Sequence, residues 1–302
     1  MSTVSITSRV ARGTTRVAAA VSHVTLCVTL CVTLCVALAS CAPSASPSGD
    51  RITDWRASAQ QSYRLGRLSA RVIDAPDAAN VAATMSSPSH AAAQTGPRRI
   101  PSAAHARGGL VIVPSDYDPA RPLPLLLLLH GAGGSAERIM RTLAAALDST
   151  RMIVVVPDSR GVTWDFIRGP FGVDVAFIDS LLHDAFARYR VDRTRVTIAG
   201  FSDGASYALS LGLSNGDLFS RVAAFSPGMA GVVATHGGPA LFVSHGARDP
   251  ILSFERTSHG IVPQLRAAGY DVTFREFDGG HEVPAAVARD GFRWLLTRAS
   301  EP

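Results

Sequence analysis

The chain has 302 residues, of which 47% are hydrophobic, and a formal net charge of +5. All 29 basic residues are arginines, which excludes a catalytic lysine, a pyridoxal-phosphate Schiff base and a Walker-type phosphate loop, because each of these requires lysine. The arginines are scattered along the sequence and no nucleic-acid-binding motif is present, so we expect no nucleic-acid partner.

The amino-terminal segment has the composition of a secretory signal peptide. A start that contains Arg9, Arg12 and Arg16 is followed by an apolar run over residues 24–39 and then by small residues. The apolar run is shorter than the about 20 residues that a membrane-spanning helix needs. All four cysteines lie within the first 41 residues, so the rest of the chain can form no disulfide, no cysteine-ligated zinc site and no cysteine nucleophile.

The end of this segment, Leu38-Ala39-Ser40-Cys41, resembles the lipobox of bacterial lipoprotein signal peptides. The resemblance implies that residues 1–41 are the signal peptide up to the lipobox cysteine, that Cys41 is lipidated, and that the exported protein contacts a membrane at the cell envelope. An ordinary signal peptide cut near Ala42, which would give a secreted protein, and an uncleaved anchor are the alternatives.

Residues 42–108 form a low-complexity linker by composition. The stretch 81–105 is rich in alanine, serine, proline and histidine and shows no apolar period, so we expect a disordered or loosely attached loop. Residues 63–72 are the possible exception, as an edge strand. The catalytic domain is expected to occupy residues 109–302.

Beyond residue 108, short apolar runs alternate with amphipathic stretches. This alternation predicts a mostly parallel sheet with helices on both faces. The continuous apolar run 125–129 is typical of a strand buried on both faces. The expected strands are 110–113, 125–129, 152–156, 195–198, 222–225, 241–244 and 271–277, and the expected helical stretches are 137–147, 174–189, 205–209, 263–268 and 284–296.

A strand, a tight turn and a helix meet at Gly200-Phe201-Ser202-Asp203-Gly204, which is the Gly-x-Ser-x-Gly pattern of a nucleophile elbow. The turn brings the start of the helix close to the end of the strand, so the positions two before and two after the serine have no room for a Cβ atom. We therefore expect Ser202 to be the nucleophile, held at the carboxyl edge of the sheet.

A serine nucleophile needs a base, and the base needs a carboxylate that orients it. Asp249 follows the strand 241–244, and His281 lies in a glycine-rich loop after the next strand, in the order Ser, Asp, His. Asp278 competes as the acid but shares the loop of the base. His245 and His259 compete as bases, but His245 breaks the expected order and His259 lies in a helical stretch.

The segment 130–134, His-Gly-Ala-Gly-Gly, follows the buried strand 125–129 and has the pattern of an oxyanion loop. We expect the backbone N–H groups of Ala132 and Asp203 to form the oxyanion hole, with Gly133 as the alternative donor. His130 is expected to have a structural role at the end of the strand.

Three aromatic side chains follow the strand 152–156 and are candidates for a substrate pocket: Trp164, Phe166 and Phe171. Ordinary packing of the loop is the alternative explanation.

Residues 108–298 resemble bacterial serine esterases of the α/β-hydrolase superfamily. The similar groups are the phospholipase/carboxylesterase and dienelactone-hydrolase types, and the polyhydroxyalkanoate depolymerase or feruloyl esterase group. Secreted depolymerases often use disulfides, and the lack of cysteine after Cys41 argues against polymer depolymerisation. The resemblance rests on Pro114-Ser-Asp-Tyr-Asp-Pro119, His130-Gly-Ala-Gly-Gly134, Gly200-Phe-Ser-Asp-Gly204, His245-Gly-Ala-Arg-Asp249 and Gly279-Gly-His281.

These motifs predict a serine esterase that cleaves small-molecule carboxylic esters through an acyl-enzyme, with Ser202, Asp249 and His281 as its triad. The mechanism requires no metal and no cofactor. A monomer or a weak oligomer is expected. A peptidase, lactonase or thioesterase on the same triad remains open, as does a non-catalytic binding lipoprotein with a hydrolase fold.

Overall fold

The structure is a computed structural model of the chain, and it describes residues 51–72, 95–101, 107–148 and 150–297. The predicted signal peptide and Cys41 lie outside the described residues. Contacts divide the chain into two units, Met1–Ile52 and Thr53–Pro302, and the sheet belongs to the second. Among the described helices, none combines the length and the apolar character needed to cross a membrane.

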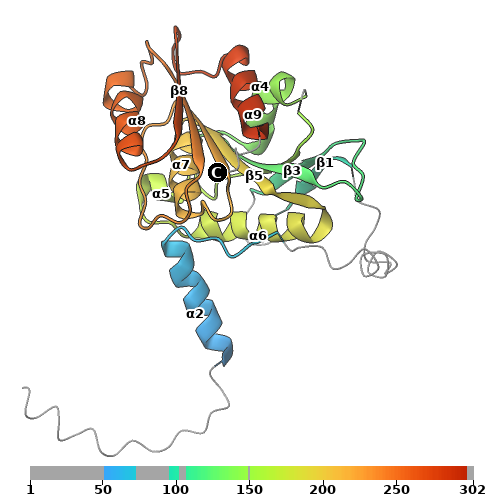
Figure 1. Cartoon of the computed structure of the whole chain (residues 1–302). Coiled ribbons are helices and arrows are strands. Elements are labelled where there is room, and N and C mark those ends of the chain that lie inside the picture. The colour runs from blue at the N-terminus through green and yellow to red at the C-terminus, as the bar shows by residue number, and fades with distance from the viewer. Residues whose placement is uncertain (1–50, 73–94, 102–106, 149, 298–302) are drawn as a thin grey trace, which may run out of the picture. The chain divides into compact units, whose positions relative to one another are not determined.

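Helices and strands alternate along most of the described chain (Figure 1). In chain order they are α2 (Arg51–Arg64), β1 (Gly96–Ile100), β2 (Gly109–Val113), β3 (Leu123–Leu129), α4 (Ala136–Leu147), β4 (Ile153–Pro157), α5 (Asp165–Arg168), α6 (Val173–Arg188), β5 (Val191–Phe201), α7 (Asp203–Ser214), β6 (Arg221–Phe225), β7 (Ala240–Gly246), the 3-10 helix η1 (Phe254–Arg256), α8 (Ser258–Ala267), β8 (Val272–Phe277) and α9 (Ala285–Leu296).

The strands form a single eight-stranded sheet in the order β1-β2-β4-β3-β5-β6-β7-β8. Strands β3 to β8 pair in parallel, while β2 pairs antiparallel with both β1 and β4. The predicted, mostly parallel sheet is confirmed. Its parallel strands all end at the same edge, so the loops that follow them gather there.

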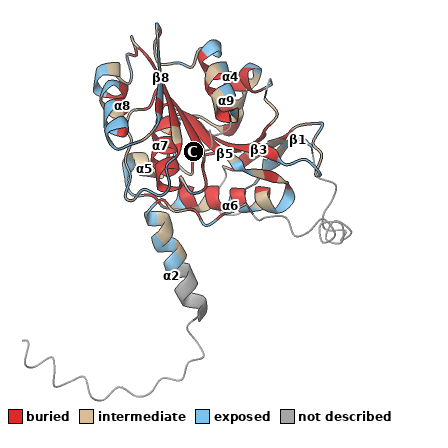
Figure 2. Ribbon diagram, in the orientation of Figure 1, coloured by how far each residue is buried: buried red, intermediate tan, exposed pale blue. Residues whose placement is uncertain are grey.

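Helices cover both faces of the sheet, as predicted, and the strands are buried between them (Figure 2). Strand β3 shows why its apolar run is continuous. Leu125, Leu127 and Leu129 pack into one core with side chains of α6, α7 and α8, whereas Leu126 and Leu128 pack into a second core with α4 and α9. A strand with a core on each face has no side on which polar residues would be stable.

Residues 63–72 do not form the edge strand that the sequence suggested. The helix α2 ends at Arg64, and the extended segment that follows is held by side chains rather than by a strand ladder. The N–H groups of Ser69 and Ala70 donate to the carboxylate of Asp179 at 2.8 Å, and the N–H of Leu68 donates to Asn215 at 2.9 Å. These side chains take the place of a partner strand.

The sheet begins before the predicted domain boundary at residue 109. Within the segment predicted to be a linker, Gly96–Ile100 pairs with all five residues of β2 as strand β1. Upstream, Leu68 and Ala70 are buried in the core of the domain. The sequence of β1 has no apolar run, because β1 is an edge strand whose side chains alternate between exposed and half-buried positions.

Candidate active site

The turn between β5 and α7 has the strained geometry of a nucleophile elbow. Ser202 has φ 58° and ψ −123°, a left-handed conformation that is rare for a residue with a side chain. A Cβ on Gly200 would lie 2.1 Å from the carbonyl oxygen of Gly204, and a Cβ on Gly204 would lie 2.4 Å from the carbonyl oxygens of Leu129 and His130. Glycine is therefore required on both sides of the serine, as the sequence pattern indicated.

The three residues predicted to form a triad lie within hydrogen-bonding distance of one another. His281 Nε2 is 2.8 Å from Ser202 Oγ, and His281 Nδ1 is 2.6 Å from Asp249 Oδ2. Since the carboxylate can only accept, Nδ1 carries the proton and Nε2 is free to accept the proton of the serine hydroxyl. The side chain of Asp249 is fully buried, while that of His281 keeps 15% of its surface exposed, next to the serine.

Hydrogen bonds keep the buried Asp249 ionised. Burial by itself raises the pKa of this carboxyl, but the backbone N–H groups of Leu252 and Ile251 and the ring of His281 lower the pKa to a value below its usual range. Asp249 Oδ1 accepts both backbone N–H groups at 2.8 Å, which leaves Oδ2 to face the imidazole. The carboxylate is thus both oriented and charged.

The competing candidates lie elsewhere. Asp278 is an exposed residue that forms an ion pair with Arg248. His259 lies in α8 on the surface, with its ring stacked on Phe254. His245 is fully buried and contacts Asp249 rather than the serine: its Nε2 is 3.2 Å from Asp249 Oδ2.

The predicted oxyanion loop lies directly against the serine. A Cβ on Gly131 would be 3.1 Å from the Cβ of Ser202. Within the described residues, no acceptor hydrogen-bonds to the backbone N–H of Ala132 or of Asp203. The N–H of Gly133, the alternative donor, is instead bonded to the carbonyl of Val162 at 2.7 Å. Both N–H groups that the sequence favoured are thus without an acceptor among the described residues, and a free donor is what an oxyanion hole requires.

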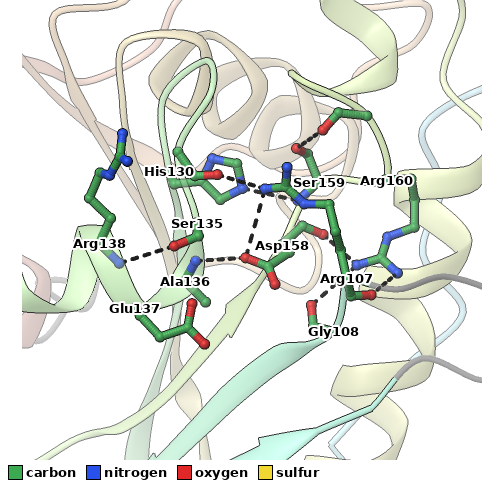
Figure 3. A network of polar contacts seen from close by, with 12 residues as sticks. Arg107, Gly108, His130, Ser135, Ala136, Glu137, Arg138, Asp158, Ser159 and Arg160 are labelled. Carbon is green, nitrogen blue, oxygen red and sulfur yellow. Dashed lines mark hydrogen bonds and ion pairs between the residues drawn. The ribbon is translucent and has the colours of Figure 1, made fainter.

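Buried polar contacts hold this loop in place (Figure 3). Asp158 accepts the N–H of Ala136 at the start of α4, and Arg107 donates to the carbonyl of Gly134 at 2.6 Å. His130 Nε2 accepts the N–H of Ser159 at 3.0 Å. These contacts join the loops after β3 and β4, so the position of the candidate donors depends on both strands.

His130 has the structural role that the sequence analysis preferred. Its Nε2 accepts from Ser159, so the other ring nitrogen, Nδ1, carries the proton and donates to the carbonyl of Gly131 at 2.7 Å. Burial lowers the pKa of His130 below its ordinary value, which favours this neutral form.

Two of the three aromatic residues predicted to line a pocket lie in the core instead. Trp164 is fully buried, donates its indole N–H to the carbonyl of His130 at 2.8 Å, and packs against Tyr207. Phe171 is 1% exposed. Phe166 is half-buried and stacks on Phe171. Trp164 and Phe171 lie on either side of the short helix α5, and both rings contact Tyr207 of α7, where burial of aromatic surface is favourable.

Several residues around the site escaped sequence reasoning. Thr163 donates to the carboxylate of Asp203 at 2.6 Å and so restrains the residue whose N–H is a candidate oxyanion donor. Arg107 and Asp158 bond to Gly134 and Ala136 at the end of the predicted oxyanion loop. His245, which the sequence offered only as a competing base, lies 3.2 Å from the carboxylate of Asp249. Their positions directly after strands were visible in the sequence for Asp158 and His245, but their partners were not.

Because His130 is neutral in the folded protein, its contribution to the free energy of unfolding should depend on pH. Since its folded-state pKa is lowered from 6.5, its contribution to stability is complete above pH 6.5 and is lost as the pH falls below that value toward the lowered pKa. We expect His130→Gln to lower the free energy of unfolding by about 2 kcal/mol at about pH 8 and by much less at about pH 5. Urea unfolding of both proteins measures the difference.

Other groups titrate over the same pH range, but their contributions to the free energy of unfolding are shared by wild type and His130→Gln and cancel in the difference. Asp174, whose pKa is raised by burial to about 6, is the main one of them. His259→Gln, at an exposed position of α8, is the matched control for the substitution itself and should change the free energy of unfolding by less than about 0.5 kcal/mol. A gap between wild type and His130→Gln that is constant over this pH range would contradict the prediction.

Comparisons with known proteins agree with this geometry. A sequence model of the Esterase family, described as "Putative esterase", matches residues 101–260, which is more than half of the chain. "Probable feruloyl esterase C" of Aspergillus niger is 28% identical over 151 residues, which cover 47% of this chain and 55% of that protein. The protein of the same description in Aspergillus oryzae is 26% identical over 204 residues, covering 57% and 74%. The alignment thus spans about half the length of the Aspergillus niger relative.

The solved structure of FphF, a fluorophosphonate-binding serine hydrolase of Staphylococcus aureus, superposes with a TM-score of 0.54 at 16% identity and covers 67% of this chain and 97% of that one. At this identity the likeness shows the fold alone. The predicted α/β-hydrolase fold is confirmed by the structures, and the predicted resemblance to esterases is confirmed at the level of the family. The chain belongs to the Esterase family, and its fold is that of the α/β-hydrolase serine esterases.

Proposed function

We propose that the protein hydrolyses carboxylic esters through an acyl-enzyme intermediate on Ser202. The proposal rests on one observation, the hydrogen-bond chain from the hydroxyl of Ser202 through the ring of His281 to the carboxylate of Asp249, with distances of 2.8 Å and 2.6 Å. These are the distances at which a base can take the proton of a nucleophile.

In the first half of the reaction, Ser202 Oγ attacks the carbonyl carbon of the ester and its proton passes to His281 Nε2. The carbonyl double bond opens to an oxyanion, which accepts hydrogen bonds from the N–H groups of Ala132 and Asp203. When the carbonyl re-forms, the bond to the alcohol breaks, and the departing oxygen takes the proton from His281.

In the second half, a water molecule repeats the attack on the acyl-enzyme. His281 takes one proton of the water, a second oxyanion forms and collapses, and Ser202 leaves with that proton while the acid product departs. Asp249 stays ionised throughout and stabilises the imidazolium of His281 in both halves.

We infer from the loops at this edge of the sheet that esters with an apolar group are preferred. Exposed apolar side chains lie in the loops after β4, β6 and β7, which end at the same edge of the sheet as β5. An acyl or aryl group that covers such side chains gains about 0.8 kcal/mol per buried methylene. The side chains are Val162 (65% exposed), Met229 (36%), Val232 (40%), Val233 (56%) and Ile251 (69%).

A substrate panel tests the function against its rivals. Of the p-nitrophenyl esters, we expect the butyrate to have a kcat/KM about tenfold above that of the acetate, because it buries two more methylenes. The matched thioester and anilide separate thioesterase and peptidase activity, which would share the same acyl-enzyme. Turnover of the thioester or anilide without turnover of any ester would contradict the proposal, and inertness toward all three would favour a binding protein.

We also propose that the esterase is exported and attached to a membrane through acyl chains on Cys41. The lipobox resemblance of residues 38–41 supports this. Two or more acyl chains give stable membrane attachment where one does not. Mass spectrometry of the full chain after expression in a bacterial host tests the proposal. A mature chain that starts at an acylated Cys41 supports it, and an unmodified chain cut near Ala42 overturns it.

A further inference from the structure

His245 is a second imidazole on the candidate acid. It is the last residue but one of strand β7, which ends at Gly246, and its side chain has no exposed surface. Its Nε2 lies 3.2 Å from Asp249 Oδ2, the same oxygen that His281 Nδ1 approaches to 2.6 Å. One carboxylate oxygen therefore faces two imidazoles, one from the loop after β8 and one from β7.

The partners of His245 determine where its proton lies. Nε2 is 2.8 Å from the carbonyl oxygen of Leu252 and also faces the carboxylate of Asp249, and both are acceptors. Nε2 therefore carries the proton. Nδ1 then has a free lone pair, which accepts the hydroxyl proton of Ser258 at 2.6 Å. Ser258 is fully buried at the start of α8, so this contact is shielded from water.

We propose that His245 is a positioning residue for the hydrolysis, which shares its Nε2–H with Asp249 Oδ2 and is itself held by the hydroxyl of Ser258. The inference rests on the proposed function, because it concerns the acid that serves His281. It extends the chain of polar contacts behind the acid in the order Ser258, His245, Asp249, His281, Ser202.

The N–H of His245 changes the negative charge on Asp249 Oδ2, the oxygen that faces His281. A donor on Oδ2 draws negative charge from the oxygen that stabilises the imidazolium of His281, so His281 releases its proton more readily. Without that donor, Oδ2 holds the imidazolium more strongly. His281 would then stay protonated, and inactive as a base, up to a higher pH.

This role requires His245 to be neutral, and its surroundings keep it so. Burial lowers the pKa of His245 below its ordinary value, and this outweighs the opposite effect of Asp249. Asp249 and His281 both act on the pKa of the ring, Asp249 raising it and His281 lowering it. On the neighbouring strand β8, Glu276 is paired in register with His245 and is exposed. The other elements packed against the ring, η1 and α8, contribute the ring of Phe254 and the hydroxyl of Ser258, neither of which is charged.

The pH dependence of kcat/KM for p-nitrophenyl butyrate tests the inference in the full-length protein. In His245→Leu, which has no donor, the acidic limb should move up by about one pH unit, the equivalent of one hydrogen bond to a charged group. In His245→Gln, the side-chain amide keeps an N–H near the position of Nε2, so the acidic limb of the pH profile should lie closer to that of wild type. Ser258→Ala leaves the imidazole in place without its hydroxyl partner and should move the limb in the same direction as His245→Leu, but less.

Ser244→Ala is the matched control. Ser244 precedes His245 on β7 and is equally buried, and its hydroxyl has no hydrogen-bond partner among the described residues. Its removal should leave the acidic limb unchanged. Thermal melting separates folded variants from unfolded ones, and Ser258→Ala decides the question if His245→Leu does not fold.

The outcomes separate this inference from the proposed function. An acidic limb that stays at the wild-type pH in folded His245→Leu or Ser258→Ala, with only the melting temperature lowered, overturns the inference and leaves the esterase function intact. A wild-type protein that neither turns over esters nor reacts with a fluorophosphonate at Ser202 overturns both.

Discussion

Replacing Ser202 by alanine is expected to lower kcat for p-nitrophenyl butyrate by about a thousandfold or more, because it removes the atom that forms the acyl-enzyme. The variant should fold, since the Ser202 side chain hydrogen-bonds through Oγ to the partly exposed ring of His281, and the strained backbone is unchanged. Steady-state kinetics measure the loss, and thermal melting confirms the fold.

Intact-mass measurement after treatment with a fluorophosphonate gives an independent check. Wild type should gain one adduct on Ser202, and Ser202→Ala should gain none. Ser180→Ala is the control, because Ser180 is an exposed serine of α6 whose hydroxyl donates to the carbonyl of Phe177. Turnover near the wild-type rate in Ser202→Ala, or an adduct on that variant, would remove Ser202 from the proposed role.

Gly200→Ala should disable the elbow without touching a reacting group. The added Cβ would lie 2.1 Å from the oxygen and 2.3 Å from the carbon of the Gly204 carbonyl, and 2.8 Å from the nitrogen of Ala205. All three atoms belong to the backbone, so no side-chain rotation relieves the clash. We expect a loss of roughly 3 kcal/mol or more in the free energy of unfolding, and loss of turnover in whatever folded protein remains.

Gly238→Ala provides the comparison. A Cβ at Gly238 meets no atom within 4 Å, so its free energy of unfolding should stay within about 0.5 kcal/mol of wild type. Urea unfolding and the rate of fluorophosphonate labelling measure both effects. If Gly200→Ala matched Gly238→Ala in stability and in labelling, the close approach of β5 and α7 would not be a constraint on the site.

Local signals in the sequence were sufficient for most of the fold. The apolar run of β3 indicated burial on both faces, and the structure has a core on each side of it. The same signals failed for the segment before β2. Strand β1 is short and alternates between exposed and half-buried residues, and residues 65–72 are held by Asp179, Asn215 and Asp217, which lie more than 100 positions away. Contacts of this kind leave no periodic pattern.

In the candidate site too, some features could be predicted from the sequence and others could not. Ser202, Asp249 and His281 were predictable because each follows a strand, and the carboxyl ends of parallel strands meet at one edge. The roles of the neighbouring aromatic residues were not. Trp164 and Phe171, on either side of α5, lie in the core rather than in a pocket, since both rings pack against Tyr207 of α7.

The sequence by itself determined the layered sheet, the elbow with its two obligatory glycines and the order of the three polar residues along the chain, because these depend on short-range sterics and on hydrophobic periodicity. Only the tertiary structure decided that His245 faces Asp249, that Gly133 is engaged by Val162, and that an N-terminal segment completes the domain. His245 and Asp249 are four residues apart and meet through the turn after β7. The physical reason for the other two is that strand order and register bring distant parts of the chain together, so spacing along the sequence does not indicate such contacts.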